Sequence, residues 1–194
     1  MNFLAHAYLS FEEPELMVGN FMADFIKGSQ YLNYPRSIAQ GILLHREIDH
    51  FTDQHPRVIT SKRRLQPRYR HYAGVVVDMY FDHFLAANFP LFHPSPLPEF
   101  TEQVYGVMRD HQEILPPKVL HLLSYMSRGN WLLSYADITG VEQALAGMSR
   151  RTKFKSHMEH AGEELRTHYD EFMDDFMAFF PEIIDFAKTK IDAL

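Results

Sequence analysis

Apolar residues recur along this chain at intervals of three and four, which is the spacing of an amphipathic helix. Four stretches in the first half show the pattern most clearly, namely residues 1–10, 14–28, 35–55 and 73–88. Prolines at the edges support these limits, because proline favours the first turn of a helix and disrupts later turns. The one segment with strand character, Val75 to Val77, is too short to outweigh its helical flanks.

The second half of the chain continues the helical pattern between further turn signals. A proline-rich link at 94–98 precedes a helix that carries Val104 and Met108 on one face. We expect further helices at 119–128, at 139–152 and, in one or two pieces with a Phe and Met stripe, at 156–194. The whole pattern predicts an all-α fold in which residues 1–194 form a single compact helical domain.

One of these helices carries polar residues where a structural helix would be apolar. The segment GILLHREIDHFTDQHP, residues 41–56, places His45 and Asp49 one helical turn apart. Both lie on or beside the stripe formed by Ile42 and Ile48, where Leu or Val would be usual. Buried polar groups need partners, so this pair indicates a site and not only a packing surface.

Other predicted helices repeat the same arrangement. Asp78 and Asp82 are one turn apart among valines and aromatic residues, and His6 and Asp24 each fall near an apolar helix face. Burying several carboxylates without a cation would cost several kcal/mol for each of them. We therefore expect a divalent metal ion with ligands drawn from His6, Asp24, His45, Asp49, Asp78 and Asp82, with His50, His55 and His83 as weaker candidates.

The composition narrows the chemistry of such a site and the class of partner. The chain has no cysteine, which excludes disulfides and thiolate ligands, so a metal must use nitrogen and oxygen donors. The net charge of −6 argues against general nucleic-acid binding. The N-terminal segment lacks a signal-peptide pattern, and no run approaches the ~18 apolar residues that span a bilayer. We expect a cytoplasmic protein with no membrane partner.

Two basic runs stand out against this acidic background. Residues 57–70 and 150–155 contain arginines and lysines and no acidic residue. We expect Arg63, Arg64, Arg150 and Arg151 to contact an acidic partner, and Arg46, which follows His45, to lie nearer the chemistry. The alternative is that these charges only solvate the surface.

Five segments carry a resemblance to a known family. They are MNFLAHAYLS, GNFMADFIKG, GILLHREIDHFTDQHP, VVDMYFDHFLA and GNWLLSY, and they occur in this order between Met1 and Tyr135. Together they resemble the acyl carrier protein phosphodiesterase family. The resemblance implies a helical hydrolase similar to the HD phosphatases and phosphodiesterases, which bind a divalent metal through His and Asp. The metal is commonly manganese, with magnesium, iron and cobalt as other possibilities. The sequence departs from the usual adjacent His-Asp doublet, since His45 and Asp49 lie one turn apart.

The family removes 4'-phosphopantetheine from holo-acyl carrier protein by hydrolysing a phosphodiester. The resemblance therefore implies catalytic roles for Asp24, His45 and Asp49, and it identifies the acidic partner as holo-acyl carrier protein. Two alternatives remain open. One is an HD-type phosphohydrolase that acts on a nucleotide or small phosphoester, and the other is a non-enzymatic helical module that binds an acidic partner. The sequence leaves the oligomeric state open.

Overall fold

The computed structural model describes residues 1–193, and this part of the chain contains helices and no strands. The α-helices are α1 (Phe3–Tyr8), α2 (Pro14–Met22), α3 (Arg36–Gln54), α4 (Pro56–Tyr69), α5 (Ala73–Ala87), α6 (Leu97–Asp110), α7 (Pro117–Arg128), α8 (Trp131–Ser134), α9 (Ile138–Ser149), α10 (Ala161–Thr167) and α11 (Tyr169–Asp192). Short 3₁₀ turns join them: η1 (Ala23–Phe25), η2 (Gln30–Asn33), η3 (Arg70–Tyr72), η4 (Phe89–Leu91), η5 (Gln112–Ile114) and η6 (Met158–His160). The predicted all-α class is confirmed, whereas the likeness to the HD fold stays a prediction.

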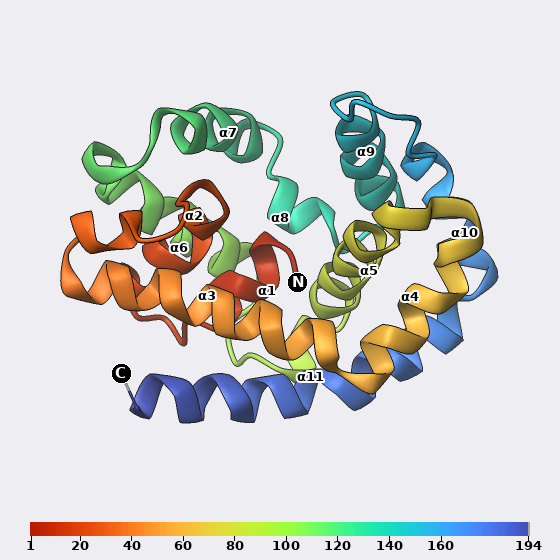
Figure 1. Cartoon of the computed structure of the whole chain (residues 1–194), viewed down its shortest axis with the longest axis horizontal. Helices are drawn as coiled ribbons and strands as arrows, with labels where there is room; N and C mark the ends of the chain where they lie inside the picture. The colour runs from red at the N-terminus through yellow and green to blue at the C-terminus, as the bar shows by residue number, and fades with distance from the viewer. Residues whose placement is uncertain (194) are drawn as a thin grey trace.

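The long helix α11 closes one side of the core. In Figure 1 it runs along the lower edge of the molecule, below α3 and α4, and it packs against α3, α4 and α5. Four of its aromatic side chains are fully buried, namely Phe172, Phe176, Phe179 and Phe180. Such aromatic groups dominate the energetics of a core, so the predicted C-terminal Phe stripe anchors this helix to the rest of the domain.

Helices α2 and α3 approach more closely than side chains would normally allow. A Cβ atom added to Gly19 would lie 2.0 Å from the carbonyl oxygen of Ile38, and one added to Gly41 would lie 2.2 Å from that of Leu16. Glycine at both positions therefore lets the two backbones touch. As a result, Asn20 at the end of α2 lies beside the middle of α3.

The limits of α3 agree with the sequence, and those of α2 do not. Helix α3 follows Pro35 and ends before Pro56, as the prolines predict. Helix α2 was expected to reach residue 28, but it ends at Met22 and the chain tightens into η1. Asp24 therefore lies in a 3₁₀ turn and not on a buried helical face.

Within residues 1–193, none of the helices combines the length and the apolar character that crossing a bilayer requires.

Candidate metal centre

His45 and Asp49 meet on one face of α3, as their spacing predicts. The Nε2 atom of His45 lies 3.1 Å from Oδ2 of Asp49. The His45 ring is buried, while the Asp49 side chain is 42 % exposed. The pair thus lies at the edge of the core, where a buried imidazole reaches a carboxylate that solvent can also reach.

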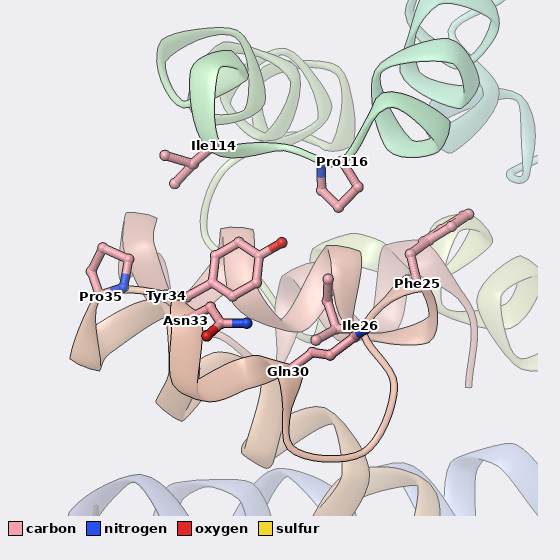
Figure 2. A pocket seen from close by; sticks show the side chains of 8 residues that line it. All are labelled: Phe25, Ile26, Gln30, Asn33, Tyr34, Pro35, Ile114 and Pro116. Atoms are coloured by element: carbon pink, nitrogen blue, oxygen red, sulfur yellow. The ribbon is translucent and has the colours of Figure 1, made fainter.

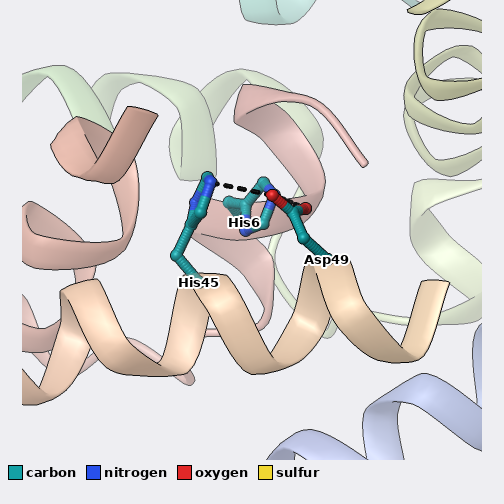
Figure 3. Close-up of side chains that lie close together, drawn as sticks. All are labelled: His6, His45 and Asp49. Atoms are coloured by element: carbon teal, nitrogen blue, oxygen red, sulfur yellow. Dashed lines mark ion pairs between the residues drawn. The ribbon is translucent and has the colours of Figure 1, made fainter. Parts of the chain in front are cut away.

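His6 joins this pair from α1. Its ring stacks on that of His45 with the centroids 3.9 Å apart, and its Nε2 atom lies 3.3 Å from Oδ1 of Asp49. Figure 3 shows both imidazoles and the carboxylate directed toward one another, with His45 and Asp49 rising from the same helix. These three residues offer ligand atoms that all lie within 4.8 Å of one another.

Asn20 fixes the orientation of both imidazoles. Its side-chain oxygen Oδ1 lies 2.7 Å from Nδ1 of His6, and its backbone oxygen lies 2.9 Å from Nδ1 of His45. The Asn20 amide nitrogen donates to the backbone oxygen of His6 and to Ser10, so Oδ1 is the atom that faces the His6 ring. A carbonyl oxygen can only accept, so each histidine donates from Nδ1, and in its neutral form each keeps the lone pair on Nε2.

The end of α2 explains why the Asn20 carbonyl is available. The last carbonyl groups of a helix have no partner within the helix, and Asn20 lies in the last turn of α2. His45 donates to this carbonyl across the close contact made by Gly19 and Gly41. The glycine pair therefore helps to build the site as well as the core.

The electrostatic environment separates the two histidines. Burial and the neighbouring His45 lower the pKa of His6 to about 4, so His6 is neutral at neutral pH. Burial acts in the same direction on His45, but hydrogen bonds with Asp24 and Asp49 raise the pKa of His45 to about 9. Burial opposes the effect, yet the hydrogen bond with His45 holds the pKa of Asp49 well below its usual range. Among His6, His45 and Asp49, it is thus His45 that is protonated at neutral pH in the metal-free protein.

Asp24 reaches the cluster from η1. Its Oδ1 atom lies 3.3 Å from Nε2 of His45, and its side chain is 68 % exposed. The hydrogen bond with His45 lowers the pKa of Asp24. The exposed position differs from the apolar placement that the sequence suggested, but it brings a second carboxylate to the open side of the cluster.

Asp78 and Asp82 have other partners. The α-amine of Met1 donates to Oδ1 of Asp78 at 3.0 Å and lies 4.0 Å from Oδ1 of Asp49. The carboxylate of Asp82 is fully buried and accepts from the backbone N–H groups of Asn2, Leu4 and Ala5. Burial raises the pKa of Asp82 to about 7, against the opposing effect of these donors. Asp82 therefore caps α1, which carries His6, and the structure does not bring it into the cluster.

The cluster has the donor chemistry that a divalent metal ion requires. His6 Nε2 is buried and makes no hydrogen bond of good geometry, although Asp49 lies 3.3 Å away. An unused imidazole lone pair beside a carboxylate is a costly arrangement unless a cation completes it. Carbonyl groups that hold the opposite ring nitrogens are also the usual support for metal-binding histidines. His6, His45 and Asp49 thus fit a metal ion, and Asp24 is the nearest additional donor.

The first basic run, residues 57–70, is less available for contact with an acidic partner than the sequence suggested. Arg64 forms an ion pair with the buried Asp175 of α11, and Ser61 donates to the same carboxylate. Arg68 pairs with Glu163 and Glu164 of α10. The expectation of a positive field without acids was therefore wrong for α4, because acidic residues distant in sequence neutralise part of it.

The other arginines singled out in the sequence lie at different places on the structure. Arg46 donates to the backbone oxygens of Ile26 and Gly28 and so holds the loop after η1 against α3. Arg63 is exposed and lines a cleft of about 610 Å³ that also includes Asp78. Arg150 and Arg151 line a different cleft. The structure does not gather these arginines into one surface.

Clefts also adjoin the cluster at η1. Phe25, the residue after Asp24, lies at one end of a cleft that includes Tyr34, Pro35 and Pro116 (Figure 2). Phe25 also lines a second cleft, of about 500 Å³, beneath α7 and the end of α9.

Sequence reasoning missed the role of Asn20. The signal was present, because Asn20 is an uncharged polar residue in the otherwise apolar run ahead of Asp24. Its function depends on the contact between α2 and α3, which no local pattern reports.

Comparisons with known proteins agree on one family. The family model described as acyl carrier protein phosphodiesterase matches residues 1–183. A protein of this description from Photorhabdus laumondii is 34 % identical over 191 residues, which is 98 % of this chain and 96 % of that protein. Proteins of the same description from an Enterobacter species and from Klebsiella pneumoniae are each 32 % identical, over 98 % of this chain and 99 % of their own. No solved structure matches the chain.

Proposed function

Because this chain belongs to the acyl carrier protein phosphodiesterase family, we propose that it hydrolyses the phosphodiester between 4'-phosphopantetheine and the serine of holo-acyl carrier protein. Water supplies the oxygen that bonds to phosphorus, and the bond from phosphorus to the serine oxygen breaks. The serine oxygen takes up a proton. The products are apo-acyl carrier protein and 4'-phosphopantetheine.

One observation carries the proposal beyond family membership. Two imidazoles present Nε2 toward the carboxylate of Asp49, and Asn20 fixes their tautomers. The cluster is open to solvent on the side of Asp24 and Asp49. A site of nitrogen and oxygen donors with an open side is the arrangement that metal-dependent hydrolases use.

We propose that His6, His45 and Asp49 hold one divalent ion and that Asp24 is a further ligand. When bound, such an ion lowers the pKa of a coordinated water and neutralises phosphate oxygens. His6 is already neutral and needs no deprotonation to bind, whereas His45 must lose its proton. The lowered pKa of Asp24 makes it a better ligand than a proton acceptor.

Manganese is the ion that we propose, on the basis of the family resemblance. The mixed set of imidazole and carboxylate donors is compatible with manganese, iron and cobalt, and less typical of magnesium, which prefers oxygen ligands. Asp78 and Asp82 do not belong to the proposed first set of ligands. Asp82 acts on His6 indirectly by capping α1.

Of the five arginines singled out in the sequence, those that remain exposed without an ion pair in the described part of the chain are the proposed contacts of the acidic carrier protein. These are Arg63, Arg150 and Arg151, whereas Arg64 is engaged with Asp175 and Arg46 with backbone carbonyls. Exposed charges of this kind accelerate encounter more than they add affinity. The proposed location of the reaction remains the cytoplasm.

The test is incubation of the purified chain with holo-acyl carrier protein and Mn²⁺, followed by intact-mass measurement of the carrier protein. We expect conversion to the apo form, loss of conversion in the presence of a chelator, and recovery when Mn²⁺ is restored in excess. A carrier protein of unchanged mass would contradict the proposed reaction. Conversion unaffected by the chelator would contradict the metal centre alone.

A further inference from the structure

The cleft under α7 is apolar inside and basic at its rim. The side chains of Phe25, Leu122, Tyr125 and Trp131 form its apolar walls, and the cleft holds about 500 Å³. Lys118, Arg150 and Arg151 lie around it. Trp131 is only half-buried and Tyr125 is 51 % exposed. Aromatic side chains gathered along one cleft are typical of a ligand-binding groove.

Two consecutive residues of η1 connect this cleft with the cluster of His6, His45 and Asp49. Phe25 lines the cleft and directly follows Asp24, whose carboxylate lies 3.3 Å from His45. Arg46 ties the next part of the loop to α3 through Ile26 and Gly28, so η1 is held in place between the cluster and the cleft. A phosphate at the cluster would therefore place its substituent against Phe25.

A second cleft lies beside Asp78. Asp78 shares the Met1 amine with Asp49, and it lines a cleft that also includes the exposed Arg63 and Arg70. No ion pair of Arg63 or Arg70 occurs among residues 1–193. Lys118, Arg150 and Arg151 at the Phe25 cleft also lack an ion pair within residues 1–193, so it is the aromatic and aliphatic lining that distinguishes that cleft.

We propose that the cleft formed by Phe25, Leu122, Tyr125 and Trp131 binds the pantetheine arm. This inference rests on the proposed function. The arm suits the apolar cleft because a gem-dimethyl group lies close to its phosphate and the amides that follow can reach polar groups at the rim. The carrier protein is acidic, so its carboxylates suit the exposed arginines around both clefts.

The bond that breaks decides which product keeps the phosphate. The bond to the serine oxygen breaks, so the phosphate leaves with the arm and not with the carrier protein. The product 4'-phosphopantetheine therefore keeps all the contacts of the cleft. It should inhibit competitively and far more strongly than inorganic phosphate, which reaches only the cluster.

Gly147 offers a way to fill the cleft without disturbing the backbone. It lines the cleft from α9, and the nearest atom to an added Cβ would be Nη2 of Arg150 at 3.9 Å. Gly106 on α6 is a matched control, since its nearest atom is Nη2 of Arg109 at 3.7 Å and it lines none of the clefts described above. Both glycines have ordinary helical backbones, so either substitution should be tolerated.

The experiment compares Gly147→Phe with Gly106→Phe on three substrates. These are holo-acyl carrier protein, a short serine peptide that carries phosphopantetheine, and bis(4-nitrophenyl) phosphate, which has no arm. We expect Gly147→Phe to lower kcat/KM on both arm-bearing substrates by about tenfold more than on the armless diester, because remote binding energy is lost. Inhibition by 4'-phosphopantetheine should weaken in parallel, while Gly106→Phe behaves as the wild type.

The outcomes distinguish failure of the proposed arm site from failure of the proposed reaction. Equal activity of Gly147→Phe and wild type on the peptide would overturn the arm site, and so would a loss confined to the carrier protein, which would assign the cleft to the protein body. An equal loss on all three substrates would also overturn it. If Gly147→Phe loses its helical circular dichroism, Tyr125→Ala replaces it, with the same expected selectivity. A wild type that cleaves no diester would contradict the proposed function itself.

Discussion

His6 and His45 stack ring on ring, 3.9 Å between centroids, although they belong to different helices. The same residue, Asn20, accepts a hydrogen bond from each of them. The stack therefore depends on where α2 ends as much as on the two helices that carry the histidines.

Substitution Asn20→Ala should weaken the metal centre without removing a ligand. The backbone carbonyl that holds His45 would remain, but His6 would lose the acceptor at Nδ1. Loss of such a supporting contact lowers metal affinity or activity by about 10- to 100-fold. Isothermal titration with Mn²⁺ measures the change.

Ser10→Ala is the control for that variant. It removes hydrogen bonds to His6 and Asn20 within the same buried network but leaves the contact at His6 Nδ1 intact. It should lower the melting temperature and leave Mn²⁺ affinity almost unchanged. If both variants bound Mn²⁺ like the wild type, Asn20 would have no part in orienting His6.

Metal binding should release about one proton near pH 7. His45, with a pKa of about 9, is protonated there, and His6, with a pKa of about 4, is not. Because the metal competes with the His45 proton, affinity should rise by about tenfold per pH unit from pH 7 to 9 and then level off. Titration calorimetry in two buffers of different ionisation enthalpy measures the proton release directly. A binding heat independent of the buffer at pH 7 would show that His45 is already neutral.

The same values predict how stability of the metal-free protein changes with pH. The pKa of His45 is raised on folding, so its contribution is complete below pH 6.5 and is lost as the pH rises through about 9. The pKa of His6 is lowered, so its contribution is complete above pH 6.5 and is lost as the pH falls toward about 4. Urea unfolding across this range should show that the free energy of unfolding falls on both the alkaline and the acidic side. His6→Gln should reduce the fall on the acidic side.

Gly41→Ala should separate α2 from α3. The added Cβ would lie 2.2 Å from a backbone oxygen that cannot move away independently. Overpacking of this kind costs about 1–3 kcal/mol, and it should also weaken Mn²⁺ binding by moving Asn20 away from His45. Gly74→Ala on α5 is the control, since its nearest neighbour is the flexible end of Lys62 at 3.6 Å. A Gly41→Ala protein as stable as Gly74→Ala would contradict the close contact.

Neighbouring arginines on α4 should behave differently. Arg64→Ala should lower the free energy of unfolding by about 2 kcal/mol, because Asp175 is buried and loses a charged partner. Arg63→Glu should leave stability unchanged, raise KM for holo-acyl carrier protein, and reduce the salt dependence of the rate. Chemical unfolding and steady-state kinetics distinguish them. A loss of stability in Arg63→Glu would mean that this side chain also has a structural partner.

Features that depend on local pattern could be predicted from the sequence. Prolines marked the limits of α3, and the spacing of His45 and Asp49 placed both on one helical face. The stripe of Phe172 and Phe176 identified the buried side of α11. Each of these features depends on residues within a few turns of one another, which periodicity records directly.

The rest required knowledge of contacts between distant segments. A buried aspartate that caps a helix has the same pattern as one that binds a metal, so Asp82 could not be separated from Asp49 by sequence alone. The acids that neutralise α4 come from α10 and α11, including Asp175. Asp24 lies in a turn because α2 ends early, and helix ends depend on tertiary partners as well as on local residues.

Equilibrium dialysis of Mn²⁺ against the wild type and the single variants His6→Ala, His45→Ala and Asp49→Ala tests the metal centre most directly. Circular dichroism of each variant confirms that the helices remain. We expect a bound ion in the wild type and a large loss of affinity in all three variants, because each removes one of three ligands. Wild-type affinity in any of the three, in a folded protein, would contradict a metal centre built on these residues.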